Sequence, residues 1–244
     1  MSEKAPPKKR KSALRADALT ERLDGEPGHG EKAGPRDDAA LKQAVLDAAL
    51  SDAAFDGITA AVLTKAGARA GVAADELARL FPDGPLSLLE FYSTWADAEM
   101  EKRLAAMNLP GMRIRERIAA AVLARLSVLK PHKEAARRAG ATLSVPTHAG
   151  LAARLMYRSV DAMWRAVGDT STDFNFYTKR GILAGVYGAT LLRWFNDSSE
   201  DEAATTEFLA ARIENVMQFE KFKAQAKKAL GNFPAFADWG KPTA

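Results

Sequence analysis

Apolar side chains recur every three or four residues along most of this chain, from residue 37 to residue 217, and glycine or proline interrupts the pattern at intervals. That spacing puts the apolar side chains on one face of an α-helix, whereas a half-buried strand would alternate them every second residue. We therefore predict an all-α fold, in which a series of amphipathic helices bury their apolar faces against one another. With 244 residues, the chain is long enough to build a sizeable core.

The helix predicted after Pro110-Gly111 illustrates the pattern. Four apolar residues recur every four positions before Pro131 ends the run: Ile114, Ile118, Val122 and Leu126. Other positions of this segment carry charged side chains, which we expect to form a solvated face: Arg113, Arg115, Glu116, Arg117 and Arg125.

Three short helices are predicted over residues 37–85. Apolar stripes define the first two, which meet at the turn Phe55-Asp56-Gly57. Gly71 makes the turn before the third helix, and Pro82-Asp83-Gly84-Pro85 closes it. Three short helices with a glycine turn before the third are typical of a helix-turn-helix. The run from Ala70 to Phe81 also resembles the DNA-binding half of TetR-type repressors.

The charge of this unit argues against DNA binding. Residues 37–82 carry four basic and seven acidic side chains, a net charge of −3. Asp75 and Glu76 stand at the start of the helix that would read the DNA, and Ala78 takes the place of the tyrosine with which TetR-type repressors usually contact phosphate. Because DNA binding depends on neutralising phosphates, a surface of this sign would repel the duplex. We interpret residues 37–85 as a degenerate helix-turn-helix-like unit that binds no nucleic acid.

The basic character of the chain belongs to its two ends. The net charge is +4 overall, but residues 1–36 contribute +3, residues 218–244 contribute +3, and the body between them stands at −2. Residues 1–36 are rich in proline, glycine and charge, so we predict a disordered basic tail.

Residues 221–244 combine lysines with aromatic side chains, a composition typical of peripheral membrane contacts. The predicted membrane contacts are Phe222, Lys227, Lys228, Phe233, Phe236 and Trp239. The alternative is a C-terminal helix that frays into a disordered end.

Two predicted helices in the second half of the chain have unusual faces. The helix from Leu151 to Val167 has a wide apolar stripe. In the helix from Tyr177 to Phe195, three glycines share one face: Gly181, Gly185 and Gly188. Each glycine inside a helix costs about 1 kcal/mol relative to alanine. We therefore expect something to approach this backbone closely, which is another helix, a second subunit or a ligand.

A groove with a glycine floor and large apolar walls suits a long isoprenoid or acyl chain. On this interpretation, residues 86–220 form a helical lipid-binding bundle. The predicted lipid contacts are Met156, Val160, Met163, Trp164, Val167, Leu183, Gly185, Val186, Tyr187, Leu191, Phe208, Ile213 and Met217. Tight helix packing or a dimer interface explains the three glycines equally well.

The linker between these two helices, Gly168 to Tyr177, is rich in aromatic residues. Gly168 is a typical helix stop, and the Asp, Ser and Thr side chains after it are able to cap the next helix. Phe174 and Phe176 then lie in an otherwise polar loop. We expect at least one of Phe176 and Tyr177 to remain on the surface as an interaction anchor. The alternative is that the rings fold back into the core.

The run Asp169 to Arg180, DTSTDFNFYTKR, resembles the signature of the TetR-like lipid-binding accessory family of ubiquinone biosynthesis. The similarity continues on both sides, through Ser159 to Arg165 and through Ile213 to Met217, and it covers most of residues 37–220. Members of that family more often carry tryptophan where this chain has Phe176, which keeps an aromatic ring but removes the indole donor.

This resemblance implies a TetR-like fold and a non-catalytic role, in which the protein binds isoprenoid quinone precursors and presents them to a di-iron hydroxylase. It implies no cofactor beyond the bound lipid, a homodimer, and a cytoplasmic protein that is peripherally associated with the inner membrane. The aromatic linker would dock the hydroxylase, and its predicted partner contacts are Asp173, Phe174, Asn175, Phe176, Tyr177 and Arg180.

The composition excludes several kinds of site. The chain has no cysteine, so disulfides, thiolate metal sites and thiol catalysis are excluded. The three histidines lie far apart and no catalytic constellation is present, so we predict neither a catalytic nor a metal site. No apolar run approaches the roughly 20 residues of a membrane-spanning helix, which indicates a soluble or membrane-surface protein. The remaining alternative is a ligand-responsive TetR-type transcriptional regulator.

Overall fold

The computed structural model describes Met1, residues 37–170 and residues 174–231, so the predicted tail lies almost wholly outside the described residues. Every regular element in these ranges is a helix, which confirms the all-α class. The α-helices are α2 (Asp38–Asp56), α3 (Ala60–Arg69), α4 (Ala74–Leu80), α5 (Pro85–Ala105), α6 (Ile114–Leu129), α7 (Lys133–Leu143), α8 (Ala149–Ala166), α9 (Phe174–Phe195) and α10 (Ala203–Gly231). Short 3-10 helices lie at Leu109–Gly111, Lys130–His132, Pro146–His148 and Glu200–Glu202.

The predicted helix-turn-helix-like unit consists of α2, α3 and α4. Thr59 caps α3, because its side-chain oxygen accepts a hydrogen bond from the Val62 amide at 3.3 Å. Gly71 has a φ of +67° in the turn before α4, a conformation that other residues adopt only with strain. Gly67 lies where α3 and α4 meet, and a Cβ there would stand 2.6 Å from Leu77 Cδ2. Glycine at this position therefore permits the close approach of the two helices.

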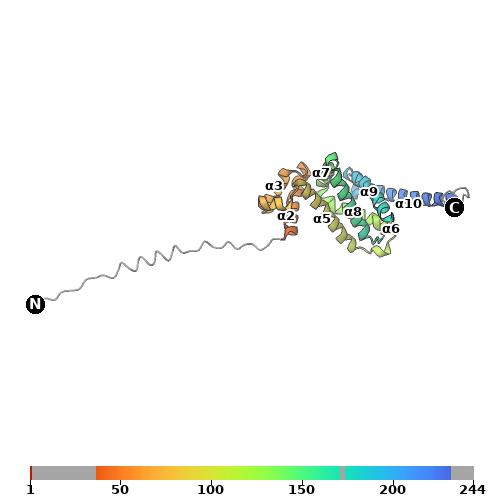
Figure 1. The fold of residues 1–244 in the computed structure, drawn as a ribbon, viewed down its shortest axis with the longest axis horizontal. Helices are drawn as coiled ribbons and strands as arrows, with labels where there is room; N and C mark the ends of the chain where they lie inside the picture. Colours follow the sequence, from red (N-terminus) through yellow and green to blue (C-terminus); the bar gives the residue numbers. More distant parts are fainter. Residues whose placement is uncertain (2–36, 171–173, 232–244) are drawn as a thin grey trace, which may run out of the picture. The chain divides into compact units, whose positions relative to one another are not determined.

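The remaining helices form a bundle that begins with α5. Figure 1 shows α5 beside α6 and α8, and α9 beside α10. α8 joins these two groups because it packs against α9 as well as α5. The helix-turn-helix-like unit shares the same core, since α2 packs on α7 and Arg138 Nε of α7 donates to the Ala54 carbonyl at 2.8 Å. One continuous apolar core therefore extends from α2 to α10.

α8 begins and ends within two residues of the helix predicted from Leu151 to Val167, whereas α9 departs from its prediction at its start. It begins at Phe174 rather than at Tyr177. Phe174, Asn175 and Phe176 therefore belong to the first turn of the helix, and the prediction that the phenylalanines lie in a loop is wrong. No glycine or proline separates these residues from Tyr177, so nothing in the local sequence prevents the helix from starting earlier.

Candidate functional site

The segment between α8 and α9 begins with a helix C-terminus built around Gly168, which has a φ of +88°. The Gly168 amide donates to the Arg165 carbonyl at 3.0 Å, and the Asp169 amide donates to the Trp164 carbonyl at 3.0 Å. These two hydrogen bonds form a Schellman motif, which satisfies the last carbonyls of α8. The turn also brings the Asp169 carboxylate to two cations of α9.

Arg180 of α9 is the buried centre of this region, with 3% of its side chain exposed. Its Nε donates to Asp161 Oδ1 at 2.7 Å, and its Nη1 donates to Asp169 Oδ2 at 3.3 Å and to the Phe176 carbonyl at 3.2 Å. A buried cation requires such partners, because its transfer from water is costly when it is unpaired. Arg180 thus joins α8, the turn after α8 and the first turns of α9.

Lys179 makes a second set of contacts with the same turn. Its Nζ lies 2.8 Å from Asp169 Oδ1 and 5.4 Å from the centroid of the Trp164 ring. The Trp164 indole N–H donates to the Lys179 carbonyl at 3.2 Å. Trp164, a predicted lipid contact, is half-buried and holds α9 against α8 through this hydrogen bond.

The two rings at the start of α9 differ in exposure. Phe176 is half-buried, and the Arg180 guanidinium carbon lies 3.4 Å from its ring centroid, which is a cation–π contact. The Tyr177 ring meets Phe176 edge-on at a centroid distance of 5.1 Å and is 68% exposed. The exposed Tyr177 ring therefore rests on Phe176, which in turn packs on the ion-paired Arg180. Exposed aromatic side chains of this kind often anchor interfaces.

The other predicted partner contacts divide according to what the structure describes. Asp173 lies outside the described residues. Phe174 and Asn175 lie in the first turn of α9, where the backbone alone is described. Arg180, which the sequence places at the edge of the docking patch, is ion-paired with Asp161 and Asp169.

The predicted lipid contacts fall into two main groups. One group is buried in the core of the bundle: Val160, Met163, Val167, Leu183, Val186 and Tyr187. The other group is half-buried: Met156, Trp164, Leu191, Phe208, Ile213 and Met217. The half-buried residues belong to α8, α9 and α10, so each of these helices has an apolar margin that solvent reaches.

Two of the three glycines of α9 point away from the core, whereas Gly188 is half-buried and a Cβ there would lie 3.7 Å from Met156 Cε of α8. Gly181 and Gly185 are exposed, and a Cβ at either position would meet nothing within 4 Å. Leu183 and Tyr187 are buried because they project from the opposite side of the helix. The prediction of one groove with Gly185 on its floor and these side chains as its walls is therefore wrong.

A buried polar network, which the sequence did not predict, ties four helices together. Arg125 of α6 is 5% exposed, and its Nε lies 2.6 Å from Asp97 Oδ1 of α5. Arg125 also donates to the Tyr187 hydroxyl of α9, and the Ser159 hydroxyl of α8 donates to Asp97 Oδ2 at 3.1 Å. Burial raises the pKa of Tyr187, so its hydroxyl stays protonated inside the bundle.

The prediction that Arg125 lies on a solvated face is wrong because α6 is buried on more than one side. Its buried residues are Ile118, Ala121, Val122, Ala124, Arg125, Leu126, Val128 and Leu129. Arg125 follows Ala121 by four residues and Val122 by three, so it continues a stripe that faces the core. An arginine on a core-facing stripe, with Asp97 in the preceding helix, is the sequence pattern from which a buried ion pair could have been predicted.

The predicted membrane contacts lie at or beyond the end of the described chain. Phe222, Lys227 and Lys228 belong to the C-terminal part of α10, where their backbone is described, and Phe233, Phe236 and Trp239 lie outside the described residues. None of the helices in residues 37–170 and 174–231 is long and apolar enough to cross a membrane. Within those ranges, no three Asp, Glu or His side chains are grouped so that they could hold a metal ion.

The sequence matches a known family over the helices that carry this site. The COQ9 family model matches residues 149–220, from α8 into α10. The ubiquinone biosynthesis protein COQ9, mitochondrial, of Rattus norvegicus is 32% identical over 194 residues, which are 77% of this chain and 62% of the relative. The corresponding proteins of Bos taurus and Homo sapiens are each 31% identical over 77% of this chain, and they are covered over 60% and 61% of their own lengths. This chain thus spans less than two thirds of the length of these relatives.

The fold is similar to that of a TetR transcriptional regulator from Nitrosomonas europaea ATCC 19718, with a TM-score of 0.58, 21% sequence identity, and coverage of 72% of this chain and 97% of the regulator. This likeness confirms the TetR-like fold. The family match includes Asp161, Asp169 and Arg180, the residues that fix the turn between α8 and α9. The chain is therefore similar to the COQ9 family, over residues 149–220 by the family model and over 77% of its length by these relatives.

Proposed function

We propose that this chain is a non-catalytic accessory protein of ubiquinone biosynthesis, which binds an isoprenoid quinone precursor and presents it to a di-iron hydroxylase. The observation that carries this proposal is the match to relatives named for ubiquinone biosynthesis, which covers 77% of the chain. A polyprenylated ring is nearly insoluble in water, so apolar side chains must cover it whenever it leaves a bilayer. A helical protein with accessible apolar margins meets that need.

The apolar margin of α9 and α10 is the place that we propose for the isoprenoid chain. These two helices pack against each other. Four of the half-buried residues lie on them: Leu191, Phe208, Ile213 and Met217. A hydrocarbon laid along these side chains would remove further apolar surface from water, at about 25 cal/mol per Å². Gly185 has no part in this site, because it lies on the other face of α9.

Mass spectrometry of lipids extracted from the natively purified protein tests this proposal. We expect isoprenoid quinones or their precursors in near-stoichiometric amounts. We also expect Ile213→Glu to reduce the lipid content, because a carboxylate at a half-buried apolar position opposes hydrocarbon binding. Ala210→Glu, at an exposed position of the same helix, is the matched control. Bulk phospholipid alone, or equal loading of both variants, would contradict the lipid site.

Tyr177 is the residue that we propose as the anchor for the hydroxylase. Loss of an anchor ring at an interface typically costs about 2 kcal/mol or more, which is roughly a 30-fold loss of affinity. We expect Tyr177→Ala to weaken binding of the purified hydroxylase by at least this factor, as measured by calorimetry. Phe176 is a poorer choice for this test, because its ring packs on the buried Arg180 guanidinium.

Tyr157 of α8 offers the matched control, because it is also an exposed tyrosine, at 45%. We expect Tyr157→Ala to bind the hydroxylase as the wild type does, and both variants to keep the wild-type circular dichroism. Wild-type affinity of Tyr177→Ala would remove Tyr177 from the interface, and an equal loss in both variants would show that the effect is not local.

We further propose that the exposed face of α9 forms a homodimer interface. Gly181 and Gly185 allow a second helix to approach the backbone, and Leu192 on the same face is 66% exposed. Sedimentation velocity is the test: we expect a dimer for the wild type and a weakened dimer for Gly185→Leu. A wild-type monomer at micromolar concentration would contradict this interface.

Peripheral association with the inner membrane is the last part of the proposal. The lysines of residues 221–244 would lie near anionic headgroups, at about 1 kcal/mol for each cation near the surface. We expect the full chain to float with vesicles that contain anionic lipid, and Lys227→Glu with Lys228→Glu to float less. Flotation that is independent of these charges and of the anionic lipid would argue against this contact.

A further inference from the structure

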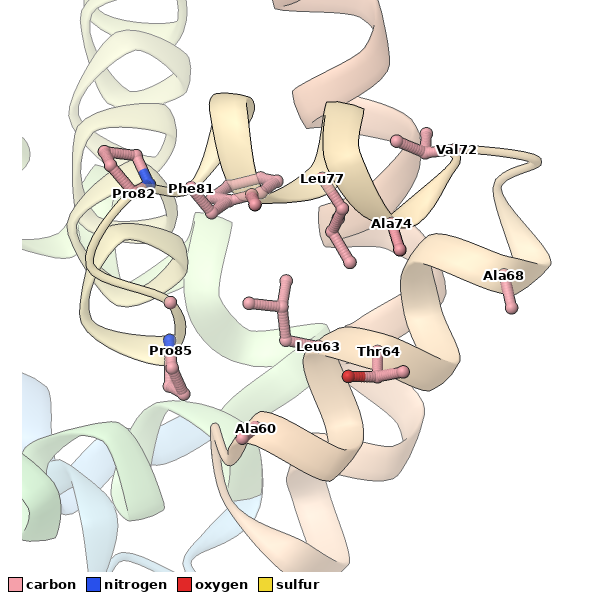
Figure 2. Close-up of a pocket in the computed structure, with 12 residues that line it drawn as sticks. Ala60, Leu63, Thr64, Ala68, Val72, Ala74, Leu77, Phe81, Pro82 and Pro85 are labelled. Atoms are coloured by element: carbon pink, nitrogen blue, oxygen red, sulfur yellow. The ribbon is translucent and has the colours of Figure 1, made fainter.

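A cavity of about 430 Å³ lies in the helix-turn-helix-like unit, away from every site described above. Its lining comes from α3, from α4 with the residues around it, and from the start of α5. We call it the α3–α4 groove. Three large side chains form its floor, namely Leu63, Leu77 and Phe81, and all three are buried. Figure 2 shows these side chains directed into the space between α3 and α4.

The walls of the α3–α4 groove are made of short side chains. Ala60, Thr64 and Ala68 line it from α3, each four residues after the last, and Ala74 and Ala78 line it from α4 with the same spacing. All five are exposed. Rows of small residues at a spacing of four let the backbone of another helix come close, while the apolar floor receives its larger side chains. The shape of the groove therefore suits a helix.

The cations beside the groove are already paired with carboxylates of α2. Lys65 and Arg69 each follow a lining residue of α3. Lys65 Nζ lies 2.8 Å from Asp52 Oδ2, and Arg69 Nη1 lies 3.0 Å from the same oxygen. Arg79 follows a lining residue of α4, and its two terminal nitrogens donate to the two carboxylate oxygens of Asp38, each at 2.7 Å. A bidentate pair of this kind holds the guanidinium in place.

Two carboxylates beside the groove lack such partners. Asp75 follows the lining residue Ala74, and Asp83 lies between the lining residues Pro82 and Gly84. Both are exposed, and neither forms an ion pair within the part of the chain that the structure describes. Because the neighbouring cations are neutralised by α2, the rim of the groove presents net negative charge to a partner.

We propose that the α3–α4 groove binds a basic amphipathic helix of a partner protein. Leucine or phenylalanine side chains of that helix enter between Leu63 and Leu77, and its lysines or arginines face Asp75 and Asp83. The sign of the rim excludes a phosphate backbone and selects a cationic partner. A fold that elsewhere reads DNA thus offers a peptide-binding groove of helix-in-groove type.

Fluorescence anisotropy with a labelled synthetic peptide tests the proposal on the full chain. The probe is a 14-residue helix in which leucines form one stripe and lysines fill the other positions. A scrambled peptide of the same composition has the same charge but no apolar face. We expect saturable binding of the striped peptide at physiological salt and at least tenfold weaker binding of the scrambled one. Equal binding of the two peptides overturns the proposal, since charge alone would then explain it.

Groove-filling variants locate the binding. Ala78→Phe keeps the charge but fills the groove, so we expect at least a tenfold loss of peptide affinity. Ala68→Phe repeats this test from α3, in case Ala78→Phe disturbs the short helix α4. Ala105→Phe, at an exposed position at the end of α5, is the matched control and should bind as the wild type does. Wild-type affinity in folded Ala78→Phe and Ala68→Phe proteins overturns the proposal.

Charge variants and self-association complete the test. Asp75→Asn with Asp83→Asn should weaken binding severalfold and flatten its dependence on salt. An unchanged salt dependence overturns the role of the acidic rim. If the wild type self-associates in sedimentation while Ala78→Phe does not, the occupant is a second copy of this chain, and the proposal of a separate partner is overturned.

Discussion

The buried Asp97–Arg125 pair allows a sharp prediction about stability. Arg125→Met keeps the length of the side chain but leaves the Asp97 carboxylate, 8% exposed, without its cation. It also removes the donor to the Tyr187 hydroxyl. Breaking a buried ion pair on one side typically costs about 3–5 kcal/mol, because the remaining charge stays buried. For a domain of this size, such a loss lowers Tm by roughly 6–20 °C.

Urea unfolding followed by circular dichroism measures this loss, and a double variant identifies its cause. Asp97→Leu with Arg125→Met removes both charges, and apolar replacements of a buried pair are often neutral or stabilising. We therefore expect the double variant to regain most of the loss, with a coupling energy of about 2 kcal/mol or more. Arg158→Met is the control, because Arg158 pairs with Glu90 at 2.7 Å on the surface. An exposed pair of this kind contributes about 1 kcal/mol or less.

Two results would refute this reasoning. If Arg125→Met costs less than about 1 kcal/mol, the carboxylate is not held in a low-dielectric site. If the double variant loses the sum of the two single losses, the two side chains act independently, and the network does not depend on their pairing.

Three further predictions concern single positions. Asp197 accepts hydrogen bonds from Ser199 and Thr205, which lower its pKa from 3.8. Asp197→Asn should therefore lower Tm at pH 7. The difference in Tm from wild type should shrink as the pH falls below about 4 toward the lowered pKa. At concentrations too low for dimers to form, Gly185→Ala should raise the free energy of unfolding by about 1 kcal/mol, since its Cβ meets open space in the monomer. A loss in urea unfolding under these conditions would show that the monomer itself covers this position. Gly67→Ala should cost about 1–3 kcal/mol by the same assay, because its Cβ would stand 2.6 Å from a leucine methyl of α4, and an unchanged midpoint would show that this methyl moves freely.

The fold was largely predictable because its signals are local. The spacing of apolar residues along the chain defines the helices, and breakers such as Gly71 and Gly168 mark where α3 and α8 end. The start of α9 was missed because the polar residues before Phe174 read equally well as a loop or as helix caps. Local sequence does not distinguish a loop from helix caps when neither glycine nor proline separates the polar residues from the helix.

The candidate site was less predictable because its geometry depends on distant segments. The side of α9 that faces the core is set by α8 and α10, and the sequence does not reveal which of two apolar faces they cover. Gly185 and Tyr187 were therefore assigned to one groove although they lie on opposite sides of the helix. Arg125 was missed for a similar reason, since its partner Asp97 lies 28 residues earlier in the chain.

The polar network also bears on how the bundle can open. Hydrogen bonds among Arg125, Asp97, Ser159 and Tyr187 join α6, α5, α8 and α9, and none of the described side chains of α10 takes part in them. Separating α9 from α6 breaks the hydrogen bond between Arg125 and the Tyr187 hydroxyl and leaves buried polar groups without partners. A hydrocarbon can replace the apolar contacts between α9 and α10 without breaking any hydrogen bond of this network.

Because of this difference, α10 should separate from the bundle at a lower free-energy cost than α6. In hydrogen exchange, we expect the amides of α10 to acquire deuterium well before those of α6, because local opening follows the least costly contacts. A hydrocarbon ligand should slow amide exchange in α10 and leave the exchange rates of α6 unchanged. Simultaneous exchange of α6 and α10 would show instead that the bundle opens as a whole.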